Sequence, residues 1–158
     1  MKDQDFHILG EGDDIVVVRR RPVQPDDTAL LFNSWCRQIR GKRPFDKMSN
    51  EDFKLYVDNI IRKIVVESDI DVAYPEGDPS VVIGFLCCDR ELRNLHYLYI
   101  KKDFRRGGVA SWLMRQRFGD DLGKCGLTLT HALPYWKHYK DKWKLELKTF
   151  DMFAKGAK

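Results

Sequence analysis

One stretch, Leu92–Met114, limits what this chain can fold into more than any other part of the sequence. Its first part, Asn94–Ile100, is aromatic and aliphatic without Gly or Pro, which predicts a buried strand, and its last part, Gly108–Phe118, has the apolar spacing of a helix. The turn between them, Lys101–Gly108, carries four basic residues and two adjacent glycines. Because backbone N–H groups at a helix N-terminus favour negative charge, we expect this turn to bind a phosphorylated ligand.

The composition is that of a globular domain rather than of a disordered or nucleic-acid-coating chain. The 158 residues are 43% hydrophobic and 33% charged, which is enough for one core. The net charge of +4 suits an anionic ligand but is too small by itself to indicate a nucleic-acid binder. We expect a single domain over residues 1–158, with flexible ends at 1–14 and 154–158.

The four cysteines indicate a reducing compartment rather than a metal site or a disulfide framework. Cys36, Cys87, Cys88 and Cys125 form no C-x-x-C pair, and no spaced Cys and His pairs suggest zinc, so we expect free thiols and no metal. No apolar run reaches membrane-spanning length, and the N-terminus lacks a signal-peptide core. We therefore expect a cytoplasmic protein that does not associate with a membrane.

The remaining patterns predict strands and helices in alternation. Strands are expected at Ile15–Val18, Ile70–Tyr74, Val81–Cys88, Asn94–Ile100, Leu127–Thr130 and Leu145–Phe153. Helices are expected from Pro25 to Gly41, over Glu51–Val65 behind a capping Ser49, over Gly108–Phe118 and over Pro134–Lys142. The order β-α-α-β-β-β-α-β-α-β predicts an α/β domain built on a mixed sheet, with helices on both faces.

Residues Leu98–Ala110, L-Y-I-K-K-D-F-R-R-G-G-V-A, resemble the acyl-CoA-binding motif of the GNAT superfamily of N-acetyltransferases. The signature of that family, R/Q-x-x-G-x-G/A after a strand, is filled by Arg105, Gly108 and Ala110. The predicted element order matches the family from Ile15 to Phe153. The resemblance implies the GNAT fold, a mixed and mostly antiparallel sheet flanked by helices. The chain is also similar to small members that bacteria or tailed bacteriophages carry.

The resemblance implies acetyl-CoA as the cosubstrate. Its pyrophosphate would bind the turn, with Lys101 or Lys102 reaching outlying phosphates, and its pantetheine arm would pair with the fourth strand where the fourth and fifth strands splay apart. The backbone N–H of Leu98 would then polarise the thioester carbonyl. The expected cofactor-binding residues are Leu98, Tyr99, Ile100, Arg105, Arg106, Gly107, Gly108, Val109 and Ala110.

Acyl transfer to an amine needs a base and an acid. The strand L-H-Y-L-Y-I resembles a strand L-H-A-L-A-V that carries the assigned base of one family member, which implies His96 as the base; a buried structural histidine is the alternative. Family members often use as the acid a tyrosine in the helix after the fifth strand, which implies Tyr139 or Tyr135. Trp143, one turn later, favours Tyr139, but the family pattern F-Y-x-x-x-G-F is not kept, so the choice stays open.

The second substrate is an amine that no motif identifies. Trp35 and Arg40, at the end of the first helix, are expected acceptor contacts, as is His131 after the fifth strand, which is also a second candidate for the base. The leading hypothesis is an N-acetyltransferase that transfers acetyl from acetyl-CoA to a primary amine of a small molecule or protein. The alternatives are a non-catalytic acyl-CoA-binding or protein-interaction module of the same fold, and a nucleic-acid surface at Arg19–Arg21 and Lys137–Lys148. An exposed last strand would allow a homodimer.

Overall fold

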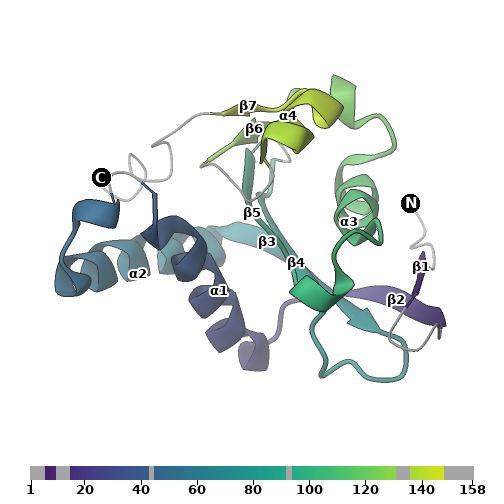
Figure 1. The fold of residues 1–158 in the computed structure, drawn as a ribbon, viewed down its shortest axis with the longest axis horizontal. Helices are drawn as coiled ribbons and strands as arrows, with labels where there is room; N and C mark the ends of the chain where they lie inside the picture. Colours follow the sequence, from purple (N-terminus) through teal and green to yellow (C-terminus); the bar gives the residue numbers. More distant parts are fainter. Residues whose placement is uncertain (1–5, 10–14, 43–44, 92–93, 131–135, 148–158) are drawn as a thin grey trace.

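The computed structural model describes residues 6–9, 15–42, 45–91, 94–130 and 136–147. These residues form a seven-stranded sheet in chain order, β1 to β7 (Figure 1). Neighbours from β1 to β5 are antiparallel, whereas β5, β6 and β7 run parallel to one another. The strands are β1 (Phe6–Leu9), β2 (Ile15–Pro22), β3 (Ser68–Pro75), β4 (Gly84–Asp89), β5 (Asn94–Ile100), β6 (Thr128–Leu129) and β7 (Glu146–Leu147).

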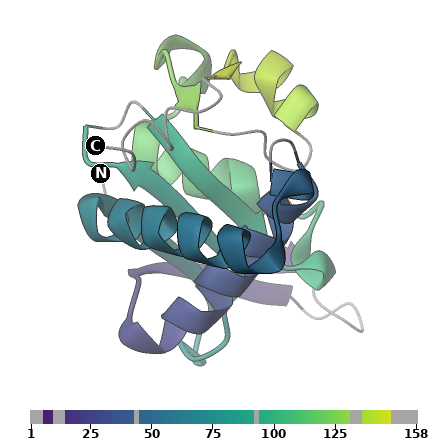
Figure 2. The same ribbon diagram turned by 90° about the vertical axis from the view of Figure 1, so that its left-hand side faces the viewer.

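The helices cover both faces of this sheet, as the sequence predicts. The four α-helices among the described residues are α1 (Thr28–Arg40), α2 (Asn50–Glu67), α3 (Val109–Phe118) and α4 (Trp136–Trp143). Figure 2 shows α1 and α2 in front of the sheet and α3 behind it. Helix α4 lies beside β6 and β7 at one end of the molecule (Figure 1). The expected fold class, a mixed and mostly antiparallel sheet flanked by helices, is confirmed.

The first strand is the main difference from the predicted element order. Phe6–Leu9 pair with Ile15–Val18 as an antiparallel edge strand, although the sequence predicted no element before Ile15. The segment is short, and its four residues do not alternate clearly between apolar and polar, so its pattern is weak. Its stability comes from pairing with β2 and from packing that a local pattern does not reveal.

Other differences concern where elements begin and end. Strand β2 continues through Arg19–Arg21 to Pro22, where it pairs with β3, and each of these arginines binds a carboxylate. Strand β4 begins at Gly84 rather than Val81. A β-carbon at Gly84 would lie 2.4 Å from the carbonyl oxygen of Tyr99, so the close approach of β4 to β5 requires glycine here. Of the predicted last strand, Glu146–Leu147 is described, and its continuation to Phe153 lies outside the described residues.

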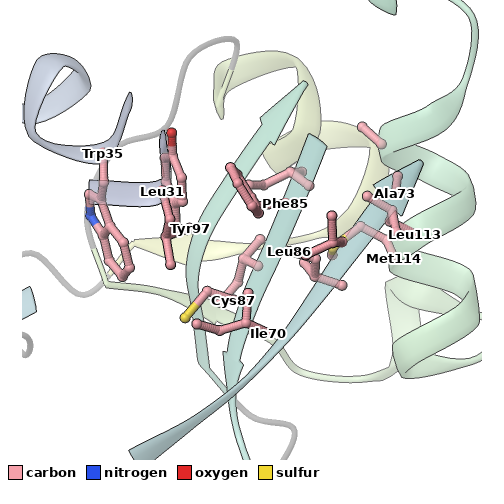
Figure 3. Close-up of a cluster of buried hydrophobic side chains, with 14 of the residues drawn as sticks. Leu31, Trp35, Ile70, Ala73, Phe85, Leu86, Cys87, Tyr97, Leu113 and Met114 are labelled. Atoms are coloured by element: carbon pink, nitrogen blue, oxygen red, sulfur yellow. The ribbon is translucent and has the colours of Figure 1, made fainter. Parts of the chain in front are cut away.

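The core lies on both faces of β3, β4 and β5. On one face Trp35 of α1 stacks on Tyr97 of β5 with ring centroids 4.8 Å apart, and on the other Leu113 and Met114 of α3 cover the strands (Figure 3). Strand β4 is buried through Gly84–Cys88, which explains why its sequence is almost wholly apolar instead of alternating. This two-sided core buries the middle of β5, and β5 leads directly into the basic turn.

Candidate functional site

Strands β5 and β6 stay together for only a short distance. Asn94 pairs with Thr128 and Leu95 with Leu129, and the backbone N–H of Thr130 donates to the carbonyl of Leu95 at 3.1 Å. Among the described residues, β5 then continues to Ile100 without a partner on this side. The two strands therefore part after Leu95, as the resemblance implies for the fourth and fifth strands.

The backbone of β5 presents hydrogen-bonding groups to this opening. The N–H of Lys101 donates to the carbonyl of Ile83, at the end of the β4–β5 ladder. Because backbone groups alternate between the two edges of a strand, those of Leu98 and Ile100 lie on the edge away from β4. The carbonyl of Ile100 accepts a hydrogen bond there from Nε of Arg105 at 2.8 Å. An extended chain carrying amides could thus pair with β5 at Leu98 and Ile100.

The basic turn follows immediately. Lys102–Phe104 form a 3₁₀ turn, and helix α3 begins after Gly108, whose φ of 87° is left-handed and suits glycine. Gly108 has no side chain with which to cap the helix, so the first backbone N–H groups of α3 have no side-chain cap. Arg106 also has a positive φ, 69°, which is uncommon for a residue with a β-carbon. These features assemble backbone donors at a helix N-terminus.

The side chains of the turn add uncompensated positive charge. Arg105, Arg106 and Lys102 are exposed, and Lys101 is half-buried. Within the described part of the chain, none of these four cations forms an ion pair, although Asp103 lies in the same turn. The helix dipole and four cations therefore favour an anion at this position.

Strand β1 lies against the other side of this turn. A β-carbon at Gly108 would lie 3.1 Å from Cζ of Phe6, and one at Gly107 would lie 3.2 Å from Cγ2 of Ile8. The ring of Phe6 also stacks on Trp112 of α3 at 5.7 Å. Gly108 therefore suits both the turn conformation and the packing of Phe6, and Gly107 leaves room for Ile8.

His96 lies where β5 and β6 part. Cys87 is opposite Tyr97 and Cys88 is opposite Leu95, so His96 is the extra residue of a β-bulge. Its side chain is only 4% exposed, and its Nδ1 lies 2.6 Å from Oγ1 of Thr130. A bulge next to an active site often redirects a side chain, so this position suits both the predicted base and a buried structural histidine.

Helix α4 brings Tyr139 to the same end of the molecule. Tyr139 is half-buried and stacks on the buried Trp143 with ring centroids 4.3 Å apart. Three residues after Tyr139, Nζ of Lys142 donates to Oγ of Ser111, in the first turn of α3, at 3.1 Å. Since residues three apart share a helix face, Tyr139 and Lys142 both lie on the side of α4 that contacts the rest of the domain. No pattern in the sequence predicts the link between Lys142 and Ser111.

The two candidates for acceptor contact on α1 have structural partners. Trp35 is fully buried under Tyr97, so its side chain lines no open surface in this structure. Arg40 donates to the carbonyls of Phe45 and Met48 and stacks on Phe53, which closes the connection between α1 and α2. None of these contacts is the expected one with an acceptor amine, and that expectation stays a prediction. His131 and Tyr135 lie outside the described residues.

Buried titratable groups next to β5 are held in their neutral forms. Burial raises the pKa of Tyr97 far above its ordinary value, even though its hydroxyl donates to Oγ of Ser34 at 2.7 Å. Burial also raises the pKa of the Cys88 thiol to about 12, and raises that of Cys87 further. These groups are therefore poor bases and nucleophiles at neutral pH, and the free cysteines match the expected thiols.

The arginines of β2 are paired with carboxylates. Arg19 binds Glu76, Arg21 binds Asp27 and Arg20 binds Asp71, which leaves little charge for a nucleic acid. The described residues contain no helix long and apolar enough to cross a membrane. They also contain no group of three or more histidine, cysteine or acidic side chains placed to hold a metal ion.

No protein-family model and no curated protein matches the chain in sequence. Several solved structures are similar to it, among them three acetyltransferases that share 12–17% sequence identity with the chain. The first is a GCN5-related N-acetyltransferase from Rhodopseudomonas palustris described as "Aminotransferase, Class-II", with a TM-score of 0.49 and 17% identity, covering 78% of this chain and 79% of that chain.

The second similar structure is a ribosomal-protein-alanine N-acetyltransferase from Brucella melitensis biovar Abortus 2308, with a TM-score of 0.41 and 15% identity over 89% of this chain and 86% of that chain. The third is an acetyltransferase of the GNAT family from Staphylococcus aureus Mu50, with a TM-score of 0.44 and 12% identity over 89% of this chain and 78% of that chain. The function proposed below therefore rests on the residues of this chain.

Proposed function

We propose that this protein is an N-acyltransferase that moves an acetyl group from acetyl-CoA to a primary amine. The observation that carries the proposal is the continuity of β5 with the basic turn. The outward backbone edge at Leu98 and Ile100 leads directly to the start of α3 and to the four cations of the turn, which form no ion pair with any described residue. A ligand with an amide-bearing arm and a diphosphate matches both parts, and coenzyme A has this chemistry.

The proposed reaction is direct attack on the thioester. The amine nitrogen forms a bond to the acyl carbon, the carbon–sulfur bond breaks, and the amine loses a proton while the thiolate gains one. The N–H of Leu98 would stabilise the developing oxyanion, which needs donors fixed before the reaction. His96 would accept the proton of the amine, and Tyr139 would protonate the thiolate.

The setting that we propose is the cytoplasm, where the buried free thiols of Cys87 and Cys88 stay reduced. The partners are acetyl-CoA and an amine acceptor. The acceptor is a small molecule or the amine of a protein, since none of the described residues distinguishes these classes.

Ligand-induced stabilisation tests the donor site first. Acetyl-CoA at 100 times its dissociation constant should stabilise the folded protein by about 2.7 kcal/mol and raise Tm, because it binds only the folded state. Arg105→Gln together with Arg106→Gln should reduce this shift. Arg115→Gln, which removes an exposed arginine from the opposite end of α3, is the matched control. A full shift in the double variant would exclude the turn as the phosphate site.

Turnover is tested separately with a panel of amines and detection of free thiol. Release of CoA that depends on an amine supports the transferase. A Tm shift without release from any amine class would instead support the non-catalytic acyl-CoA-binding module. Glycine 108 is a poor test position, because any side chain there meets Phe6 and a left-handed φ, so loss of binding could reflect loss of folding.

A further inference from the structure

We propose that Thr130 is a positioning residue that fixes His96 in the tautomer with its proton on Nδ1, which leaves the Nε2 lone pair as the proton acceptor. The proposal rests on the proposed N-acyltransferase function for its catalytic consequence. It rests on the structure alone for the tautomer. Thr130 was expected only as the end of a strand.

The contact is short and shielded from water. Nδ1 of His96 and Oγ1 of Thr130 are 2.6 Å apart, and the two residues are 4% and 3% exposed. Water therefore competes little for either group. A buried hydrogen bond is costly to break, because each of its groups would lose a partner away from water.

The hydroxyl of Thr130 has one proton and a second acceptor within reach. Oγ1 lies 3.3 Å from the carbonyl oxygen of Leu95 in the geometry of a donor. With the hydroxyl donating to Leu95, Oγ1 acts as the acceptor in its contact with His96, and the proton between them then belongs to Nδ1. A neutral imidazole protonated on Nδ1 carries its lone pair on Nε2.

The backbone holds Thr130 in this orientation. Its own N–H donates to the same Leu95 carbonyl at 3.1 Å, so Thr130 contacts Leu95 through both its main chain and its side chain. Leu95 directly precedes the bulge that contains His96. The hydrogen bonds from Thr130 of the β6 side to Leu95 of β5 therefore also orient the side chain of His96, the next residue of β5.

The catalytic consequence concerns one proton. During attack, the proton leaves the amine nitrogen for Nε2, and the Nδ1 proton stays bound to Oγ1 of Thr130. The imidazolium formed donates from both nitrogens, so Thr130 keeps accepting throughout. The hydroxyl thus matters to His96 as an acceptor and not as an acid.

The nitrogen chemical shifts of His96 in the full-length protein decide the tautomer without any substrate. The ¹⁵N-labelled protein should show a protonated Nδ1 and a bare Nε2, and Thr130→Ser should show the same. Thr130→Val, which replaces the hydroxyl by a methyl group of similar size, should lose this preference. A wild-type protein with its proton on Nε2 would overturn the proposal, even if the valine variant fails to fold.

Kinetics then test the role in positioning. With an accepted amine, Thr130→Val should lower kcat/KM for the amine by about tenfold, a fraction of the full contribution of a general base. Thr130→Ser should restore it, and the dissociation constant of acetyl-CoA should stay unchanged in both. Unimpaired turnover in the valine variant would remove Thr130 from the mechanism. Absence of turnover in wild type would refute the transferase, while the tautomer would still be decided by the spectrum.

Discussion

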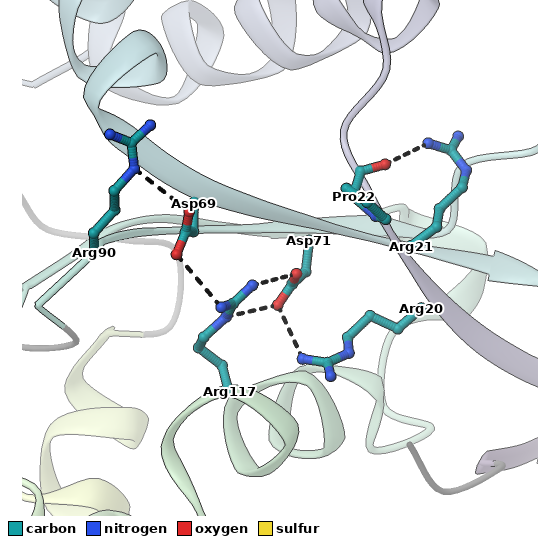
Figure 4. Close-up of polar contacts among 7 residues, drawn as sticks. All are labelled: Arg20, Arg21, Pro22, Asp69, Asp71, Arg90 and Arg117. Atoms are coloured by element: carbon teal, nitrogen blue, oxygen red, sulfur yellow. Dashed lines mark hydrogen bonds and ion pairs between the residues drawn. The ribbon is translucent and has the colours of Figure 1, made fainter. Parts of the chain in front are cut away.

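Two arginine-rich regions of this molecule differ in how their charge is balanced. Beside β3, Arg117 and Arg20 both bind Asp71, and Arg117 and Arg90 also reach Asp69 (Figure 4). In the turn before α3, Arg105 and Arg106 have no carboxylate partner within the described residues. The amino-acid composition does not distinguish the paired arginines beside β3 from those of the turn.

The difference indicates which region serves structure and which serves binding. A hollow of about 360 Å³ lies beside Asp69 and Asp71, yet its charged walls already neutralise one another. Binding a ligand there would require ion pairs to break. The turn has no such pair with a described residue, so an anion can bind there without displacing one of these carboxylates. The candidate site is therefore identified by arginines that have no carboxylate partner among the described residues, and not by the number of arginines.

Removal of the central carboxylate should have the largest effect on stability. Asp71 is 5% exposed and binds Arg117 at 2.9 Å and Arg20 at 3.2 Å, so Asp71→Asn removes the carboxylate that these two arginines share. We expect a loss of about 3–4 kcal/mol in the free energy of unfolding, measured with urea. The more exposed Asp69, changed to Asn, should cost less than about 1 kcal/mol. Equal losses in the two variants would contradict the central role of Asp71.

The pair of Arg21 with Asp27 should make stability depend on pH. The hydrogen bonds from Arg21 hold the pKa of Asp27 below its usual range despite its burial. A lowered folded-state pKa stabilises the protein above the unfolded pKa of about 3.9, and this contribution is lost as pH falls through the folded value. Asp27→Asn should therefore cost about 2 kcal/mol at pH 7 and progressively less below pH 4 in urea unfolding. A gap independent of pH would show that ionisation is not the cause.

The turn should respond in the opposite way, with an effect on ligand binding and little on folding. Arg105→Gln should weaken acetyl-CoA about tenfold in calorimetric titration, while the free energy of unfolding changes by less than about 0.5 kcal/mol. Among the described residues, the exposed side chain of Arg105 donates one hydrogen bond, to the carbonyl of Ile100. A large loss of stability with unchanged affinity would place Arg105 with the structural arginines.

The smallest effect should come from the backbone of the turn. Arg106 has a φ of 69°, so Arg106→Gly should relieve strain and raise stability by about 1 kcal/mol relative to Arg106→Ala. Both variants should bind acetyl-CoA more weakly than wild type, because both lose the charge. Equal stability of the glycine and alanine variants would show that the turn bears no strain.

The parts of the fold that were predictable depend on neighbours in sequence. Strand β5 has the predicted bounds, Asn94–Ile100, and α3 starts one residue after its predicted start at Gly108. Both have dense apolar patterns and clear glycine signals. Strand β1 was not predictable, because a four-residue edge strand is specified mainly by β2 and by the turn against which it packs.

The same limit applies to the candidate site. The basic residues, the glycines and His96 are adjacent in sequence, so the donor turn could be recognised. Thr130 is 34 positions from His96, and Lys142 is 31 positions from Ser111. Such pairs form only through the sheet and the placement of α4, and no spacing in the sequence indicates them. The acceptor is not identifiable from the sequence for the same reason, because residues that are distant in the sequence meet only in the folded chain.

The packing of β1 on the donor turn links the affinity for the ligand to an edge of the sheet. Phe6 and Ile8 lie behind Gly108 and Gly107, so the turn has its full support only while β1 is paired with β2. An edge strand opens more readily than the central strands. The apparent dissociation constant of a ligand that needs the supported turn is the intrinsic one divided by the fraction of molecules with β1 in place. A ligand that needs the supported turn would therefore favour molecules in which β1 is paired with β2, and the stability of that pairing would contribute to its apparent affinity.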